Sequence, residues 1–133
     1  EGVTLNNIGG IHDDLGDKTQ ALDYYEQALV IQRDVGDRSG EGVTLNNIGR
    51  IHSALGDKTQ ALDYYEQALV IHQMVGNRSV ESITRYNIAI IHYSQGNIPK
   101  AINELAQAVE LERQVQHPDY QQDLTLLERW KAE

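Results

Sequence analysis

The chain of 133 residues contains no cysteine and only two prolines. Without cysteine it can form no disulfide framework, no thiolate zinc site and no cysteine nucleophile. No stretch reaches the ~20 consecutive apolar residues that a membrane helix needs, and the first residues lack the basic and then apolar pattern of a secretory signal. These absences predict a soluble, cytoplasmic protein. There is also no initiator methionine, so we expect an excerpt of a longer chain, or a processed or engineered product.

Positive charge is scarce as well. The formal net charge is −9, with 11 Lys and Arg against 20 Asp and Glu. This sign is opposite to the one that a phosphate backbone or an anionic lipid surface attracts. We therefore expect no nucleic-acid partner and no membrane partner.

The clearest pattern in the sequence is a repeat of 40 residues. Residues 1–40 and 41–80 are nearly copies of each other, and a more diverged third unit begins at Glu81. In each unit two apolar stripes with helical spacing are separated by a Gly-Asp or Gly-Asn pair, and no segment shows the period-two alternation of a half-buried strand. The repeat predicts a helical hairpin per unit, and the amphipathic segment 118–133 predicts a seventh, capping helix.

The dipeptides between the stripes predict how the helices end and begin. Gly16, Gly56 and Gly96 can take the left-handed conformation that closes a helix. The residues that follow them are Asp or Asn, which cap the next helix by accepting backbone N–H bonds. We expect the same at Gly36 and Gly76, and we expect Pro99 in the first turn of its helix.

Small and large residues recur in each unit at spacings that resemble the tetratricopeptide (TPR) signature. In the second unit the matching residues are Gly49, Gly56, Ala61, Tyr65 and Ala68, and those of the first unit are Gly9, Gly16, Ala21, Tyr25 and Ala28. The third unit matches with Ala89, Gly96, Ala101, Leu105 and Ala108. A TPR unit usually has ~34 residues, and 40 residues is also a length of HEAT and armadillo repeats with two or three helices. The Gly and Ala spacing favours TPR with lengthened helices.

This long form resembles the arrays of Pins/LGN-like adaptors, kinesin light chains and bacterial signalling proteins. The resemblance implies an all-α, right-handed superhelix (a TPR solenoid) of three helical hairpins plus a C-terminal capping helix. We expect a single TPR domain over residues 1–133, with repeats 1–40, 41–80 and 81–117 and a capping helix at 118–133.

Chemistry-bearing residues follow the repeat and form no asymmetric site. His12, His52 and His92 recur once per unit, so they should lie on the order of 10 Å apart, too far for one metal ion, and we expect them in the seam between helices. Glu1, Glu41 and Glu81 recur in the same way, which favours outward-facing positions. No phosphate loop or hydrolase motif is present. The sequence predicts no enzyme activity, no metal and no cofactor.

In TPR families the inner helix of each hairpin lines a concave groove, and this is where the resemblance places a peptide-binding site. The candidate groove residues are Asn6, Asn7, Asn46, Asn47, Arg50, Ile83, Tyr86, Asn87, Ile90 and Tyr93. Asn7, Asn47 and Asn87 form a ladder whose amides can pair with a peptide backbone, although Asn at this place also bonds to neighbouring inner helices. Tyr86, Ile90 and Tyr93 form an apolar patch that is either a binding hot spot or the seat of the C-terminal helix.

The basic residues of a chaperone-type carboxylate clamp are missing, because the matching places are Asn6, Ile83 and Asn87. Arg50 and Arg85 remain as isolated cations that could meet an acidic partner. The leading hypothesis is a protein-interaction module that binds a peptide segment or a helix of a partner protein. The alternatives are a homo-oligomer that stacks end to end through an uncapped N-terminal hairpin, and an excerpted or engineered array with no partner of its own.

Overall fold

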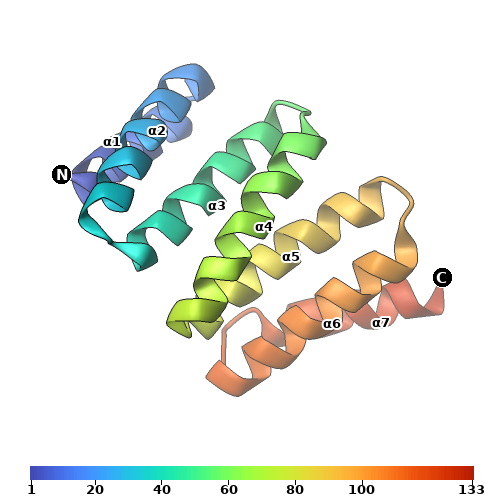
Figure 1. Ribbon diagram of the computed structural model, residues 1–133. Helices are drawn as coiled ribbons and strands as arrows, with labels where there is room; N and C mark the ends of the chain where they lie inside the picture. Colours follow the sequence, from blue (N-terminus) through green and yellow to red (C-terminus); the bar gives the residue numbers. More distant parts are fainter. The chain divides into compact units, whose positions relative to one another are not determined.

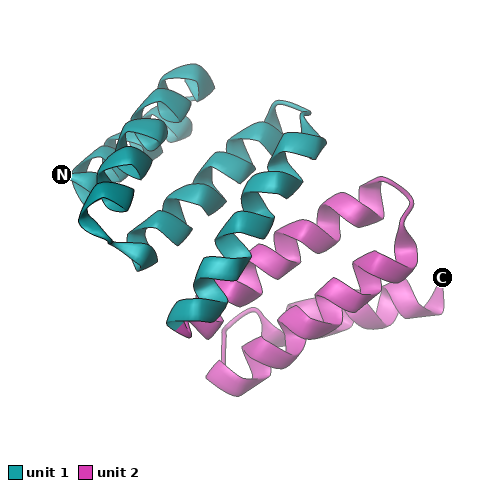
Figure 2. Cartoon of the chain, in the orientation of Figure 1, with its two compact units in different colours: residues 1–75 teal, residues 76–133 magenta.

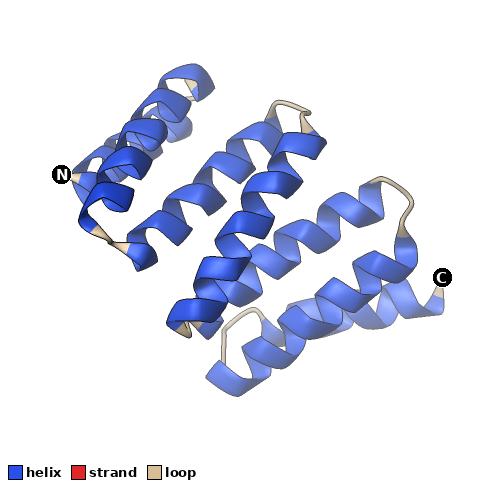
Figure 3. Ribbon diagram, viewed as in Figure 1, coloured by secondary structure: helices blue, strands red, loops and turns tan.

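The computed structural model describes residues 1–133, and its regular secondary structure consists of seven α-helices and no strands (Figures 1 and 3). The helices are α1 (Gly2–Asp14), α2 (Lys18–Val35), α3 (Arg38–Ala54), α4 (Lys58–Val75), α5 (Arg78–Ser94), α6 (Ile98–Val115) and α7 (Tyr120–Ala132). The prediction of two helices per unit and a terminal helix is confirmed. Three-helix repeats are excluded. None of the seven helices is long and apolar enough to cross a membrane.

The helix ends follow the predicted turn chemistry. Gly16, Gly56 and Gly96 have φ angles of 81°, 84° and 80°, which place them in the left-handed region. Asp17 then accepts the backbone N–H of Gln20 at 3.1 Å and caps α2. The third unit departs from the prediction at Asn97, whose side chain makes no cap hydrogen bond. There Pro at the start of α6 removes one of the N–H groups that need a cap.

The chain divides into two compact units, residues 1–75 and residues 76–133 (Figure 2). In the compact unit of residues 1–75, α1 packs on α2, α2 on α3, and α3 on α4. Its core is built from Ala, Tyr, Leu and Ile side chains of the two apolar stripes, with Leu45 and Ile48 fully buried. The repeated sequence thus builds one continuous core across two hairpins.

In the compact unit of residues 76–133, α5 pairs with α6, and α7 packs against α6. Its core joins Ala89, Ala101 and Leu105 of the last hairpin to Leu127 and Trp130 of α7. Helix α7 therefore buries its apolar face against the last hairpin, as expected for a capping helix.

The small residues of the signature lie where two helices approach closely. A Cβ atom added at Gly9 would lie 2.7 Å from Cε1 of Tyr25, and one at Gly49 would lie 2.7 Å from Cδ1 of Tyr65. In the third unit the corresponding residues are Ala89 and Leu105, both completely buried. This size exchange keeps the seam filled in all three hairpins.

Candidate functional site

In the compact unit of residues 1–75, the candidate residues come from α1 and α3, and we call them the asparagine patch: Asn6, Asn7, Asn46, Asn47 and Arg50. The Nδ2 group of Asn47 donates to Oδ1 of Asn6 at 3.2 Å, and the Thr44 hydroxyl donates to the same oxygen at 3.3 Å. Asn46 is buried, whereas Asn7 is exposed. Part of the ladder therefore joins neighbouring inner helices, the structural role that the sequence had left open.

Arg50 is the only charged residue of the asparagine patch. Its side chain is half exposed, with one guanidinium nitrogen 3.4 Å from Oδ1 of Asn47 and another 3.9 Å from Oδ2 of Asp13. Asp13 also pairs with Lys18. Because these contacts are long and the Arg50 side chain is half exposed, they hold it weakly.

In the compact unit of residues 76–133, the candidate residues all come from α5, and we call them the tyrosine patch: Ile83, Tyr86, Asn87, Ile90 and Tyr93. Ile83 and Ile90 are 42% and 38% exposed. The Tyr93 ring stacks on Trp130 of α7 with 4.4 Å between centroids, and its hydroxyl donates to Glu133 at 2.6 Å. Tyr93 therefore seats the C-terminal helix, while the isoleucines remain open to solvent. The buried Nδ2 of Asn87 has no hydrogen-bond partner.

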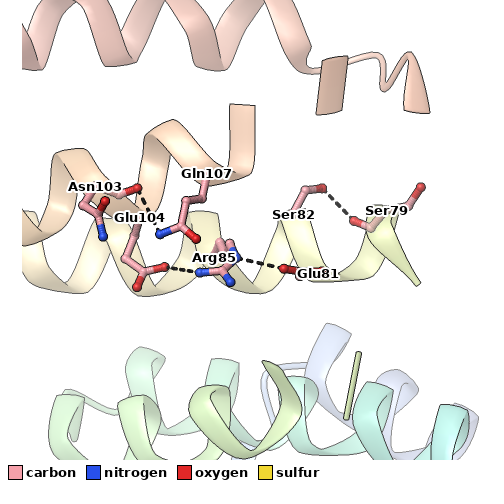
Figure 4. Close-up of polar contacts among 7 residues, drawn as sticks. All are labelled: Ser79, Glu81, Ser82, Arg85, Asn103, Glu104 and Gln107. Atoms are coloured by element: carbon pink, nitrogen blue, oxygen red, sulfur yellow. Dashed lines mark hydrogen bonds and ion pairs between the residues drawn. The ribbon is translucent and has the colours of Figure 1, made fainter. Parts of the chain in front are cut away.

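Arg85 is not the isolated cation that the sequence suggested. It is buried in α5, where Nε donates to Oε2 of Glu81 at 3.0 Å and a terminal nitrogen donates to Oε2 of Glu104 at 3.0 Å (Figure 4). Arg85 occupies the position of Leu45 in the repeat, and Glu104 that of Tyr64. The third repeat thus has a largely buried ion pair where the second repeat has an apolar and an aromatic residue, which leaves Arg85 unable to reach a partner.

The expectation of outward-facing glutamates is wrong for two of the three positions. Glu41 is buried and accepts from Arg33 at 3.1 Å and from Arg38 at 3.2 Å. Glu81 is bound to Arg85, as described above. The helical period cannot show this, because a long arginine side chain can reach a glutamate from a neighbouring turn, as Arg38 and Arg85 do, or from the preceding helix, as Arg33 does.

The histidines of the first two units lie in the seam as expected. The His12 ring stacks on Tyr24 with 5.2 Å between centroids, and His52 stacks on Tyr64 with 5.4 Å. His92 is buried. The three residues therefore have a packing role in their hairpins.

A feature that the sequence did not reveal is an acidic pocket of about 160 Å³ within residues 76–133. It is lined by Ser82, Ile83, Tyr86, Glu112, His117, Asp119, Gln122 and Asp123. Burial and the nearby Asp123 carboxylate raise the pKa of Glu112 to about 8, and burial also raises the pKa of Asp123. Two candidate residues of the tyrosine patch, Ile83 and Tyr86, thus belong to a polar site built with α6 and α7.

The helical hairpins and their close Gly–Tyr contacts agree with a comparison to known families. A profile of the tetratricopeptide repeat family matches residues 1–74 and 59–114. The chain belongs to the tetratricopeptide repeat family. No curated protein matches the sequence.

Several solved structures share the TPR fold of this chain. BtubC (BKLC) from P. vanneervenii superposes with a TM-score of 0.85 at 19% identity, over 98% of this chain and 56% of that chain. RapI gives a TM-score of 0.90 at 16% identity, over 98% of this chain and 37% of that chain. A putative kinesin light chain of Podosopora anserina, with nearly identical TPR-like repeats, gives a TM-score of 0.77 at 17% identity, over 96% of this chain and 64% of that chain. The TPR chain thus spans less than two thirds of each of these proteins.

Proposed function

We propose that this TPR chain is a protein-interaction module that binds a peptide segment or helix of a partner protein through its inner helices. The observation that carries the proposal is the exposure of Ile83 and Ile90 on α5, on either side of the half-buried Tyr86 ring. Such apolar and aromatic side chains are the usual anchors of a binding hot spot. The half-exposed Arg50 and the exposed Asn7 supply polar contacts on the inner helices α3 and α1.

The asparagine patch has a narrower part in this proposal than a full ladder would have. Asn47 already gives one of its two Nδ2 protons to Asn6, so its amide can offer a peptide only the remaining N–H and the oxygen that now faces Arg50. Asn7 has a free face toward solvent because it is exposed. We therefore assign the main apolar contact to the tyrosine patch and an orienting role to the asparagine patch.

The experiment is affinity capture of partners from the source cell, followed by calorimetry of the purified pair. We expect Ile90→Ser to weaken binding at least about 10-fold, since loss of a hot-spot side chain costs about 2 kcal/mol or more. The matched control is Val70→Ser, because Val70 is an exposed apolar residue on the outer helix α4. Loss of affinity in the Val70 variant, with the Ile90 variant unchanged, would place the binding surface on the outer helices.

Self-association is the second candidate, and one contrast between the repeats favours it. Ile11 of α1 is 58% exposed, whereas its equivalent Ile51, covered by α2, is only 1% exposed. A second copy that covered α1 would bury Ile11 in the same way. Light scattering over a concentration series tests this: association should be lost in Ile11→Asn. A wild-type chain that stays monomeric throughout excludes it.

A further inference from the structure

The acidic pocket contains a buried carboxyl oxygen that has no hydrogen-bond donor. Glu112 of α6 is only 2% exposed, and its buried Oε1 receives no hydrogen bond from any donor in the structure. The other oxygen lies 3.6 Å from Nδ1 of His117, which is beyond hydrogen-bond distance. Because that nitrogen already accepts the Asp119 amide N–H at 3.1 Å, it has no proton to give to Glu112. A buried carboxyl group without a donor calls for a proton or a cation.

No Lys or Arg fills that need, since the only basic residue that lines the pocket is His117, whose Nδ1 accepts the Asp119 amide N–H. The neighbouring Arg85 and Arg113 are engaged elsewhere, with Glu81 and Glu104 and with Glu110. Asp123 of α7 faces Glu112, and Asp119 stands at the more open side with 61% of its side chain exposed. Three carboxyl groups from two helices and a turn therefore converge on one small cavity.

The remaining walls suit a flat cation with an apolar stem. Tyr86 of α5 contributes an aromatic ring, and its pKa is raised by burial and by the nearby Asp123, Asp119 and Glu112 carboxylates. Ile83 lies at the exposed edge. A guanidinium is planar, stacks on aromatic rings and bonds to carboxylates in bidentate fashion, whereas an ammonium is a compact, strongly hydrated point charge. These walls favour arginine over lysine.

We propose that the pocket formed by Tyr86, Glu112, Asp119 and Asp123 binds the guanidinium of an arginine side chain of the partner protein. The inference rests on the proposed function, because it assigns one side chain of the bound partner. Before the partner binds, a proton shared by Glu112 and Asp123 satisfies the pair. The incoming guanidinium takes its place, and the proton leaves to solvent.

The groups that face Glu112 fix the sign of the pH dependence. They are Tyr86 from α5, His117 and Asp119 from the turn after α6, and Asp123 from α7. Arginine keeps its charge throughout, so binding favours the deprotonated carboxyl pair. Affinity for arginine should therefore rise as the pH rises toward 8.

The test uses the whole chain and the peptide acetyl-Gly-Gly-Arg-Gly-Gly-amide, with the neutral citrulline peptide as control. We expect saturable amide shifts at Tyr86, Asp119 and Asp123 in NMR titrations, with a dissociation constant on the order of 1 to 10 mM for one side chain. Calorimetry in buffers of different ionisation enthalpy should show proton release at pH 7. Equal shifts with citrulline, or no saturation with arginine, would overturn the proposal.

Variants separate this pocket from the rest of the binding surface. Glu112→Gln should weaken binding of the arginine peptide about 10-fold, which is the effect of losing one charge-assisted hydrogen bond. It should also abolish the proton release. Glu110→Gln, on the exposed side of the same helix, should change neither. Asp119→Asn, at an exposed position, serves if Glu112→Gln does not fold. A captured partner that binds Glu112→Gln normally but loses affinity for Ile90→Ser overturns the arginine pocket and keeps the proposed function.

Discussion

One position of the repeat buries a polar side chain in every unit. It is occupied by Gln32, His72 and Glu112, which are 2%, 1% and 2% exposed. In the first unit the Gln32 amide lies 2.8 Å from the Thr44 hydroxyl of the next helix. In the last unit the next helix is α7, which presents Asp123. The same backbone position thus pairs two neutral groups at one end of the chain and two acids at the other.

The Glu112 carboxyl should make stability fall as the pH rises. Because its pKa is raised to about 8 in the folded chain, the folded state holds the proton more tightly than the unfolded state. The stabilisation is present below the ordinary pKa of a glutamate and is lost as the pH rises through about 8. The slope is at most about 1.4 kcal/mol per pH unit for one proton.

Urea unfolding between pH 5 and pH 9 measures this slope. We expect Glu112→Gln to flatten it, because glutamine does not titrate, and Glu110→Gln to leave it unchanged. A wild-type chain with equal stability across this range would contradict a shared proton in the acidic pocket.

Gln116 is the only residue other than glycine with a positive φ angle, at 56°. It closes α6, where Gly36 and Gly76 close α2 and α4. We expect Gln116→Gly to stabilise the chain by roughly 0.5 to 1 kcal/mol, since a left-handed conformation costs an ordinary residue about 1–2 kcal/mol and part of that gain is lost to chain entropy. Gly76→Ala should destabilise it. Urea midpoints of the two variants should therefore move in opposite directions.

At the scale of helices, the close contacts of the hairpins should respond to size. Ala61 of α4 is completely buried, whereas Ala54 at the end of α3 is exposed. We expect Ala61→Leu to destabilise the chain by about 1–3 kcal/mol through overpacking and Ala54→Leu to have little effect. Thermal melting followed by circular dichroism compares them. Equal melting temperatures would show that the helix register is wrong.

The helices were predictable because their signals are local. A glycine that needs a positive φ angle, a cap three residues before a free N–H, and a period of 3.6 can each be recognised within one unit. The acidic pocket was not predictable, because Glu112 and Asp123 are brought together by the left-handed turn at Gln116 and by the path of α7. The signal that was present is the change from Gln32 to Glu112 at a repeated position.

The buried Arg85 shows the same limit in the candidate surfaces. A charged residue on an inner helix suggests a binding site, but the repeat alignment places Arg85 where Leu45 is fully buried. Glu104 replaces an aromatic residue at the facing position. Only the coincidence of the two replacements would have indicated an internal ion pair, since each one alone resembles an exposed charge.

At the scale of the whole molecule, the single TPR domain over residues 1–133 stays a prediction. If the chain is one cooperative domain, the calorimetric and van't Hoff enthalpies of unfolding should agree. Independent melting of residues 1–75 and 76–133 would give a calorimetric enthalpy well above the van't Hoff value. Differential scanning calorimetry decides between these outcomes. Ala61→Leu should shift the whole transition if the chain is one domain, and only the transition of residues 1–75 if the two parts melt independently.

The copied sequence of the first two hairpins also gives the refolding chain a choice of partners. Residues 15–31 and 55–71 are identical. Helix α1 can therefore close on α4 and pack Gly9 against Tyr65, just as it packs Gly9 against Tyr25 of α2. Each doubling of the connecting loop costs only about 0.6 kcal/mol. Chain entropy therefore favours the adjacent helix by only about 2 kcal/mol over a partner some 40 residues further on. Kinetic traps with exchanged helices follow directly from the two units being copies.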